Sequence, residues 1–276
     1  MPTKKPRGSL TVYFSDNLPV LEKMPESSVD MIYIDPPFNT GRRQLRTRFH
    51  TAGSMKVADE SFGYGDSFDD FIGFLAPRMR EAFRVLKPDG SLFFHIDYRE
   101  VHYCKVMLDG IFGRDSFMNE IIWAYDYGAR SKTRWSAKHD NILWYAKDPD
   151  NYTFNYGEMD RIPYMAPELA GPEKAARGKT PTDVWWHTIV SPGGREKTGY
   201  ATQKPRGVID RIVKMHSRPG DVLLDFFAGS GTLGESARAL GRSAILVDSN
   251  PDAIRVMRRR FAGLGAKWIG CGTIAE

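Results

Sequence analysis

Hydrophobic and polar positions are grouped along the chain in blocks that predict strands separated by helices. Short apolar runs, typical of buried strands, occupy residues 10–14, 29–34, 90–96, 119–125, 141–147, 221–227 and 243–248. Apolar residues at helical spacing predict helices over 67–86, 206–217, 232–240 and 250–265. Strands that alternate with helices are typical of an α/β fold, doubly wound around a mostly parallel sheet.

Local signals predict where some of these elements begin and end. Ser67 is a candidate N-cap of the first predicted helix, and Pro77 is expected to kink or restart that helix. Residues 87–90 (KPDG) predict a turn. Asn250, followed by Pro251 at the first helical position, predicts the start of the last helix.

In two segments, the apolar residues follow neither the spacing of a helix nor that of a strand. Residues 42–66 are polar, contain glycine and are aperiodic, so we predict a functional loop there. Residues 148–200 are rich in proline, glycine, tyrosine and charge, and we predict irregular excursions rather than an independent domain. The 276 residues suffice for one large α/β domain, so we treat 1–276 as a single domain.

Composition excludes several classes of protein. Two cysteines, Cys104 and Cys271, cannot by themselves make a disulfide framework or a zinc site. No apolar run approaches the length of a membrane span, and no apolar stretch follows the basic start of the chain. We therefore expect a soluble, cytoplasmic protein without a membrane partner. No His, Cys and Asp grouping has metal-ligand spacing, so we predict no catalytic metal.

The net charge of +5 and the pI of about 9.1 become informative through the positions of the basic residues. The first basic group is Arg42, Arg43, Arg46 and Arg48. The second is Arg130, Lys132, Arg134 and Lys138, with Trp135 inside it. Solvated loops explain such groups about as well as contacts with a polyanion do, but both groups are candidate nucleic-acid contacts.

A nucleotide-binding unit is predicted near the C-terminus. A strand ends at Asp225, a turn with Gly229 and Gly231 follows, and the next strand ends at Asp248. Glycines allow close approach of a ligand to the backbone, and an acid at a strand end accepts hydrogen bonds from ribose hydroxyls. The G-x-G spacing lacks the third glycine of a pyrophosphate site. This favours a nucleoside-type cofactor without a pyrophosphate, such as S-adenosylmethionine. Because an acid lies on each side of the glycines, we prefer this interpretation to an ordinary tight turn.

A second motif, DPPF, follows the strand 29–34. We consider whether this motif could bind an exocyclic amine of a base that is to be methylated. Such an amine is a poor nucleophile because its lone pair is delocalised into the ring. The Asp35 carboxylate and the Pro36 carbonyl can accept its two hydrogens, Pro37 stiffens the loop, and Phe38 offers a face for an extruded base. On its own, the motif is equally consistent with a simple strand stop.

Taken together, these motifs resemble those of the DNA amino-methyltransferases, which carry [DNS]-P-P-[YFW] and F-x-G-x-G. Phe227, Gly229 and Gly231 match the second pattern. Thr202, Gln203 and Lys204 in YATQKP resemble the family's T-x-K-P motif on the cofactor side. Asp16 matches a family acid that would face the adenine of the cofactor, although Ser15 replaces the glycine that usually precedes it.

The order of the motifs resembles the β group of this family, with the catalytic motif first. The resemblance implies a class I, Rossmann-like methyltransferase fold with a reversed edge strand and an irregular target-recognition insertion. It divides the chain into a catalytic half (10–127), a target-recognition region (128–196) and a cofactor half (197–262). It also implies double-stranded DNA as substrate with base flipping, a homodimer as an expected assembly, and a cognate restriction endonuclease as a candidate partner.

The target base is predicted from Asp35, because in this family an acid at that position usually accompanies methylation of adenine N6, whereas serine usually accompanies methylation of cytosine N4. Cytosine N4 in DNA, RNA or a protein amide as substrate, and a non-catalytic DNA-binding protein remain alternatives. His95 ends a predicted strand, and we predict a polar structural role for it. His139 and Asp140 resemble a family pair and are predicted to support the sheet.

Overall fold

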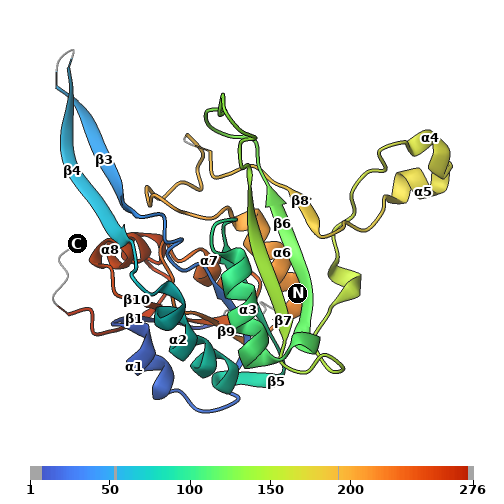
Figure 1. Cartoon of the computed structure of the whole chain (residues 1–276), viewed down its shortest axis with the longest axis horizontal. Helices are drawn as coiled ribbons and strands as arrows, with labels where there is room; N and C mark the ends of the chain where they lie inside the picture. Colours follow the sequence, from blue (N-terminus) through green and yellow to red (C-terminus); the bar gives the residue numbers. More distant parts are fainter. Residues whose placement is uncertain (1–7, 53–54, 192, 273–276) are drawn as a thin grey trace.

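The computed structural model describes residues 8–52, 55–191 and 193–272, with the backbone alone over 42–52 and 55–65. Nine described strands form one central sheet in the order β11-β1-β10-β9-β2-β5-β7-β6-β8 (Figure 1). They are β1 (Leu10–Phe14), β2 (Val29–Ile34), β5 (Leu86–Ile96), β6 (Phe117–Ala124), β7 (His139–Ala146), β8 (Val184–Trp186), β9 (Val222–Asp225), β10 (Ser243–Asp248) and β11 (Lys267–Ile269). All seven predicted strands are present, with ends that shift by a few residues.

The sheet is parallel except for β7, which pairs antiparallel with both β5 and β6. The predicted class I fold with one reversed strand is therefore confirmed. The reversed strand is not at the edge, because β6 and β8 extend the sheet beyond it. As a result, the connection from β6 to β7 lies at the carboxyl edge of the parallel strands.

Helices cover both faces of the sheet and produce two hydrophobic cores. One face carries α6 (Arg206–His216), α7 (Thr232–Ala239) and α8 (Pro251–Arg260). The other carries α1 (Asn17–Glu22), α2 (Phe71–Val85) and α3 (Val101–Phe112). Strand β2 serves both, since Met31 and Tyr33 join the first core and Ile32 and Ile34 the second. Burial on both faces explains the continuous apolar runs that predicted the strands.

The prediction of a loop over 42–66 is wrong. These residues form an antiparallel hairpin of β3 (Arg42–Ala52) and β4 (Met55–Asp66), with a register shift between Thr47 and Phe49. The hairpin projects from the body of the protein beside the carboxyl edge of the sheet (Figure 1). It pairs with no strand of the central sheet, so the alternation that a half-buried strand would require is absent from its sequence.

Two predicted boundaries are corrected. Helix α2 is capped by Asp70, whose carboxylate accepts from the Gly73 amide at 2.7 Å, and it continues through Pro77 without restarting. The predicted turn at 87–90 lies within β5. Its extra residues form a bulge, since consecutive pairs join Val29 to Leu86 and then Met31 to Ser91.

Some elements were not predicted. Helix α3 escaped prediction because Tyr103 and Val106 on its solvent side are large and exposed, which blurs its apolar stripe. The region 148–200 contains the short helices α4 (Pro167–Ala170) and α5 (Pro172–Arg177) and the 3-10 helix η2 (Tyr156–Glu158) in addition to β8, and its remainder is irregular. Figure 1 shows α4 and α5 as an outlying lobe at the end of the sheet that carries β8.

Gly231 is required by the start of α7, where it has φ of +75°. A Cβ there would lie 2.8 Å from the side chains of both Met257 and Phe261. We expect Gly231→Ala to lower the free energy of unfolding by about 2–4 kcal/mol, through left-handed strain and overpacking. Urea denaturation measures this. In the control, Gly110→Ala on α3, a Cβ meets nothing within 4 Å, so unchanged or slightly higher stability is expected.

Candidate active site

Four carboxylates follow four adjacent strands of the sheet. Strands β1, β10, β9 and β2 are neighbours and run parallel, so their carboxyl ends meet at one edge. Asp16 lies two residues beyond β1, Asp248 and Asp225 end β10 and β9, and Asp35 follows β2. Residues from the two ends of the sequence are therefore brought into one row, at the edge where ligands bind in open α/β sheets.

A cavity of about 440 Å³ lies along this row. Of the residues predicted to form the site, the following line it: Asp16, Asp35, Pro37, Thr202, Lys204, Asp225, Phe227, Gly229 and Asp248. Four do not: Pro36, Phe38, Gln203 and Gly231. The aromatic side chains of Phe68, Phe74 and Tyr200 add flat apolar surface. The volume and the mixture of aromatic and polar groups suit a nucleoside-sized ligand.

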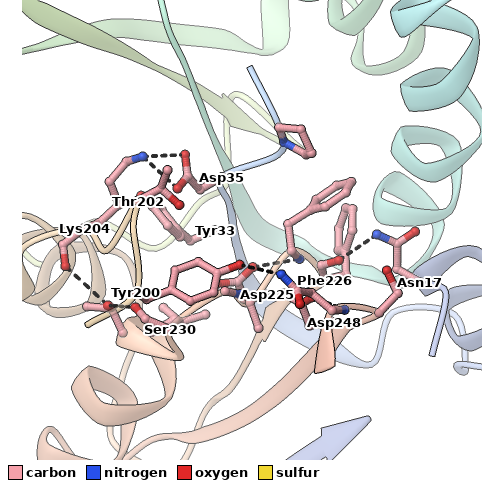
Figure 2. Close-up of a pocket in the computed structure, with 18 of the residues that line it drawn as sticks. Asn17, Tyr33, Asp35, Tyr200, Thr202, Lys204, Asp225, Phe226, Ser230 and Asp248 are labelled. Atoms are coloured by element: carbon pink, nitrogen blue, oxygen red, sulfur yellow. Dashed lines mark hydrogen bonds and ion pairs between the residues drawn. The ribbon is translucent and has the colours of Figure 1, made fainter. Parts of the chain in front are cut away.

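One end of the cavity is an ion pair. The Lys204 ammonium donates to both oxygens of Asp35, at 2.8 and 2.7 Å (Figure 2). The same nitrogen lies 4.6 Å from the centroid of the Phe38 ring, while His95 packs against that ring with a centroid separation of 6.0 Å. Both charged side chains are largely buried, with exposed fractions of 10% and 16%. Asp35, Lys204 and Phe38 thus form one compact unit.

The glycine-rich turn is held by the two strand-terminal acids. Asp248 accepts from the Gly229 amide at 2.7 Å and from the Asn250 amide at 2.8 Å, and Asp225 accepts from the Phe227 amide at 3.0 Å. Burial raises the pKa of Asp248 to about 6 despite these amide bonds. Burial also raises the pKa of Asp225 well above its ordinary value, and the negative charges of Asp35 and Asp248 add to this effect.

The opposite end of the cavity is formed by Asp16 and Asn17. Asp16 caps α1 by accepting from the Leu18 amide at 2.9 Å, and it pairs with Arg78 at 3.0 Å. Asn17 donates to the Phe226 carbonyl at 2.7 Å and accepts from Arg78 at 2.5 Å. Because Arg78 is buried and satisfied by these contacts, the acid keeps a fixed position at the rim.

Gln203 has a supporting position. Its side-chain oxygen accepts from both the amide and the hydroxyl of Thr198 at 2.8 Å, and its nitrogen donates to the Glu196 carbonyl at 2.8 Å. These bonds fold residues 196–203 onto themselves and leave Thr202 and Lys204 facing the cavity. A cofactor contact of Gln203 stays a prediction, as does one of Gly231.

His95 belongs to a buried chain of hydrogen bonds beneath the site. Its Nδ1 bonds the Tyr33 hydroxyl at 2.7 Å, its Nε2 bonds Asp140 at 3.1 Å, and the Tyr125 hydroxyl donates to Asp140 at 3.1 Å. Burial is the largest single effect and would raise the pKa of Asp140, but the hydrogen bond and attraction of His95, the charge of Lys204 and the hydrogen bond from Tyr125 together hold that pKa below its ordinary value. The contacts agree with the structural roles predicted for His95 and Asp140.

Sequence reasoning missed Tyr33, Tyr200 and Asn250 as residues that line the cavity. Tyr33 reads as core packing, because it lies inside an apolar run. Tyr200 precedes the recognised TQKP residues, and Asn250 is explained by its role as the N-cap of α8. Only Tyr200 carried a usable signal, since it adjoins a motif already assigned to the cofactor.

The structure describes the side chains of the second basic group only. Arg42, Arg43, Arg46 and Arg48 are on β3, and their side chains lie outside the described part of the structure. In the connection from β6 to β7, Lys132, Arg134 and Trp135 are exposed. Two of its cations have partners in the same loop: Arg130 pairs with Asp126, and Lys138 donates to the Tyr127 and Ala129 carbonyls. None of the four residues of the second group lines the cavity.

Within the described ranges, no three His, Cys, Asp or Glu side chains gather in a geometry suited to a metal ion. Among the helices that the structure describes, none is long and apolar enough to cross a membrane.

The chain matches a family described as DNA methylase over residues 29–259. It is also 30% identical over 269 residues to the DNA adenine methyltransferase YhdJ of Escherichia coli (strain K12), and this match covers 94% of the chain and 85% of that relative.

Two solved structures share the fold. The cytosine-N4-specific PvuII DNA methyltransferase is 18% identical with a TM-score of 0.66, over 96% of this chain and 92% of that chain. The complex of M1.HpyAVI with SAM is 20% identical with a TM-score of 0.62, over 92% of this chain and 99% of that chain.

Proposed function

The chain belongs to the S-adenosylmethionine-dependent DNA methylases of the β group, and from this membership we propose that it methylates adenine N6 in duplex DNA. The observation that carries the proposal is the position of Asp35 at one end of a nucleoside-sized cavity, beside the ring of Phe38. A methyl donor in the cavity and an amine at Asp35 would then lie next to each other.

The cavity suits S-adenosylmethionine along its whole length. The adenine would lie at the Asp16 end among Phe68, Phe74 and Phe227. The ribose hydroxyls would donate to Asp248, whose carboxylate has acceptor capacity beyond the two amide bonds. The amino-acid part would then lie near Lys204, next to Asp35. When bound, the cofactor supplies an electrophilic methyl group on a sulfonium.

The catalytic unit would act on the amine. Asp35 and the Pro36 carbonyl accept its two hydrogens, which draws its lone pair out of conjugation and toward the methyl carbon. The nitrogen–carbon bond would form as the carbon–sulfur bond breaks, and the electron pair of the carbon–sulfur bond would stay on sulfur. The amine proton passes to Asp35 or to water. Phe38 would hold the flipped base in the pocket by stacking. No covalent enzyme intermediate is required, and both cysteines are buried away from the site.

The two acceptors, the Asp35 carboxylate and the Pro36 carbonyl, form what we call the amine clamp. The same clamp supports cytosine N4 as the alternative target. Both bases present an exocyclic amine with two hydrogens, and a carboxylate with a carbonyl can accept from either. The preference for adenine therefore rests on the acid at position 35 and on similarity to an adenine enzyme. We also propose the region 128–196 for target recognition, and a homodimer and a cognate endonuclease as partners.

Transfer of labelled methyl groups from S-adenosylmethionine to unmethylated genomic DNA tests the activity. We expect incorporation into DNA and none into RNA or protein added in equal mass. Absence of incorporation by a folded protein that binds S-adenosylhomocysteine would favour the non-catalytic DNA-binding alternative instead.

The raised pKa of Asp248 predicts a pH dependence of cofactor binding. The ionised carboxylate is the better acceptor for ribose hydroxyls, so affinity should be constant above pH 7 and fall as the pH drops through about 6. We expect the Kd for S-adenosylhomocysteine to rise about tenfold between pH 7.5 and pH 5. Calorimetric titration measures it. Asp248→Asn should bind more weakly at pH 7.5 and show a flat profile, and an unchanged slope in that variant would exclude Asp248 as the titrating group.

The exposed cations between β6 and β7 predict a salt-dependent contact with DNA. We expect the double variant Lys132→Gln, Arg134→Gln to weaken binding to duplexes of any sequence, and to reduce the slope of log K against log salt by about two, because each phosphate contact contributes about 0.9. Fluorescence anisotropy measures both quantities. The control is Arg259→Gln, an exposed cation near the far end of α8, whose first residue is at the cavity. An equal slope in both variants would contradict the assignment.

A further inference from the structure

We propose that Lys204 occupies the place of the target amine until the cofactor draws it away, so that cofactor binding opens the base pocket. This inference rests on the proposed function. The contact between Lys204 and Asp35 would then be broken during each catalytic cycle.

The Lys204 ammonium lies where the amine of the target base would bind. Its nitrogen donates to both oxygens of Asp35 (Figure 2). The same nitrogen lies 4.6 Å from the centroid of the Phe38 ring. A flipped base needs the same two groups, an acceptor for its amine and an aromatic face for its ring. His95 already packs against Phe38. The lysine therefore occupies the Asp35 carboxylate and the face of the Phe38 ring. A flipped base could not bind these two groups while the ammonium stays there.

The charges around the cavity indicate what would displace it. Four carboxylates line the cavity, from Asp16, Asp35, Asp225 and Asp248, whereas Lys204 is the one lysine or arginine among its described lining residues. A cofactor with a carboxylate and its methyl group near Asp35 must place that carboxylate in this anionic surrounding. Among the described residues of the cavity, Lys204 is the cation that can compensate it, and an ammonium bonds one carboxylate well only by loosening its hold on another.

The lysine can change partners without movement of the chain. Its main-chain carbonyl accepts from the Thr232 hydroxyl at 3.3 Å, and Pro205 follows it, so the backbone is fixed beside the cavity. The four-carbon side chain carries the charge and has the rotamer freedom to turn between two nearby acceptors. Binding of the cofactor carboxylate would thus free Asp35 and the face of Phe38 together.

The test compares two ligands that differ only in the carboxylate, S-adenosylhomocysteine and its decarboxylated amine analogue, by calorimetric titration without DNA. The ratio of their dissociation constants reports what the carboxylate contributes. In Lys204→Met, the ratio should fall to about one. In Asp35→Asn, where no ion pair has to be broken, the preference for the carboxylate should increase by about tenfold over the wild type. In the double variant, it should again be about one.

A matched lysine–aspartate pair serves as control. Lys87 on β5 pairs at 2.6 Å with Asp30, which lies on β2 at the end opposite to Asp35. Lys87→Met and Asp30→Asn should leave the ratio unchanged. If Asp35→Asn and the wild type had equal ratios of the two dissociation constants, the proposed change of partner by Lys204 would be overturned. Lys204 would then not be shared between two anions. Absence of binding of either ligand to the wild-type protein would overturn the proposed function as well, which separates the two failures.

Discussion

Asp35→Asn should lower kcat/KM for methyl transfer to unmethylated genomic DNA by about a thousandfold. The amide keeps the size of the side chain and one acceptor oxygen, but it loses the charge that strengthens hydrogen bonds from the amine and that can receive its proton. Its NH2 group would also face the NH2 group of the base. Steady-state rates of labelled methyl incorporation measure the effect.

Cofactor binding separates loss of chemistry from loss of structure. We expect Asp35→Asn to retain binding of S-adenosylhomocysteine, because only one end of the cavity is changed. Asp30→Asn removes a carboxylate from the start of β2, the strand that Asp35 follows, at the end away from the cavity, and it should leave the rate within about twofold of wild type. Turnover by Asp35→Asn at near wild-type rates would rule out the amine clamp.

His95→Leu should lower the free energy of unfolding by about 3–5 kcal/mol at pH 7. The leucine leaves the buried Asp140 carboxylate without its main partner and the Tyr33 hydroxyl without its acceptor. Removal of the hydrogen-bond partner of a buried carboxylate is costly because its charge remains in a low-dielectric surrounding. Urea denaturation followed by tryptophan fluorescence measures the loss.

The pH dependence of this loss identifies its cause. In the wild-type protein, the pKa of Asp140 is below its ordinary value, so its stabilising contribution is present at neutral pH and disappears as the pH falls through that pKa. In His95→Leu, the carboxyl should protonate more readily, and the difference in stability should shrink between pH 7 and pH 4. Adding Asp140→Asn to His95→Leu should recover about 2 kcal/mol at pH 7. A difference independent of pH would indicate lost packing instead.

The parts of the fold that sequence predicted are those where burial determines residue type. Strands buried on both faces are continuous apolar runs, and all seven such runs became strands of the sheet. Acids that follow these strands could be assigned to one ligand-binding edge, because parallel neighbours place their carboxyl ends together. The hairpin β3–β4 and helix α3 could not be recognised, since neither has a clean apolar period.

The contacts inside the site were beyond reach for a different reason. Asp35 and Lys204 are 169 positions apart, and their direct pairing depends on how the loop 196–205 folds over the sheet edge. The sequence indicated only that Lys204 belongs on the cofactor side. Tyr33 was hidden in a core strand, and its hydroxyl acquires a role only because His95 from β5 lies beside it.

The most direct test of the central claim is mass spectrometry of nucleosides from unmethylated DNA that has been incubated with the purified protein and S-adenosylmethionine. We expect N6-methyladenine as the modified nucleoside, and its absence after incubation with Asp35→Asn. N4-methylcytosine in its place would retain the amine clamp and contradict the adenine assignment. No methylated nucleoside from a folded, cofactor-binding protein would contradict the proposed activity itself.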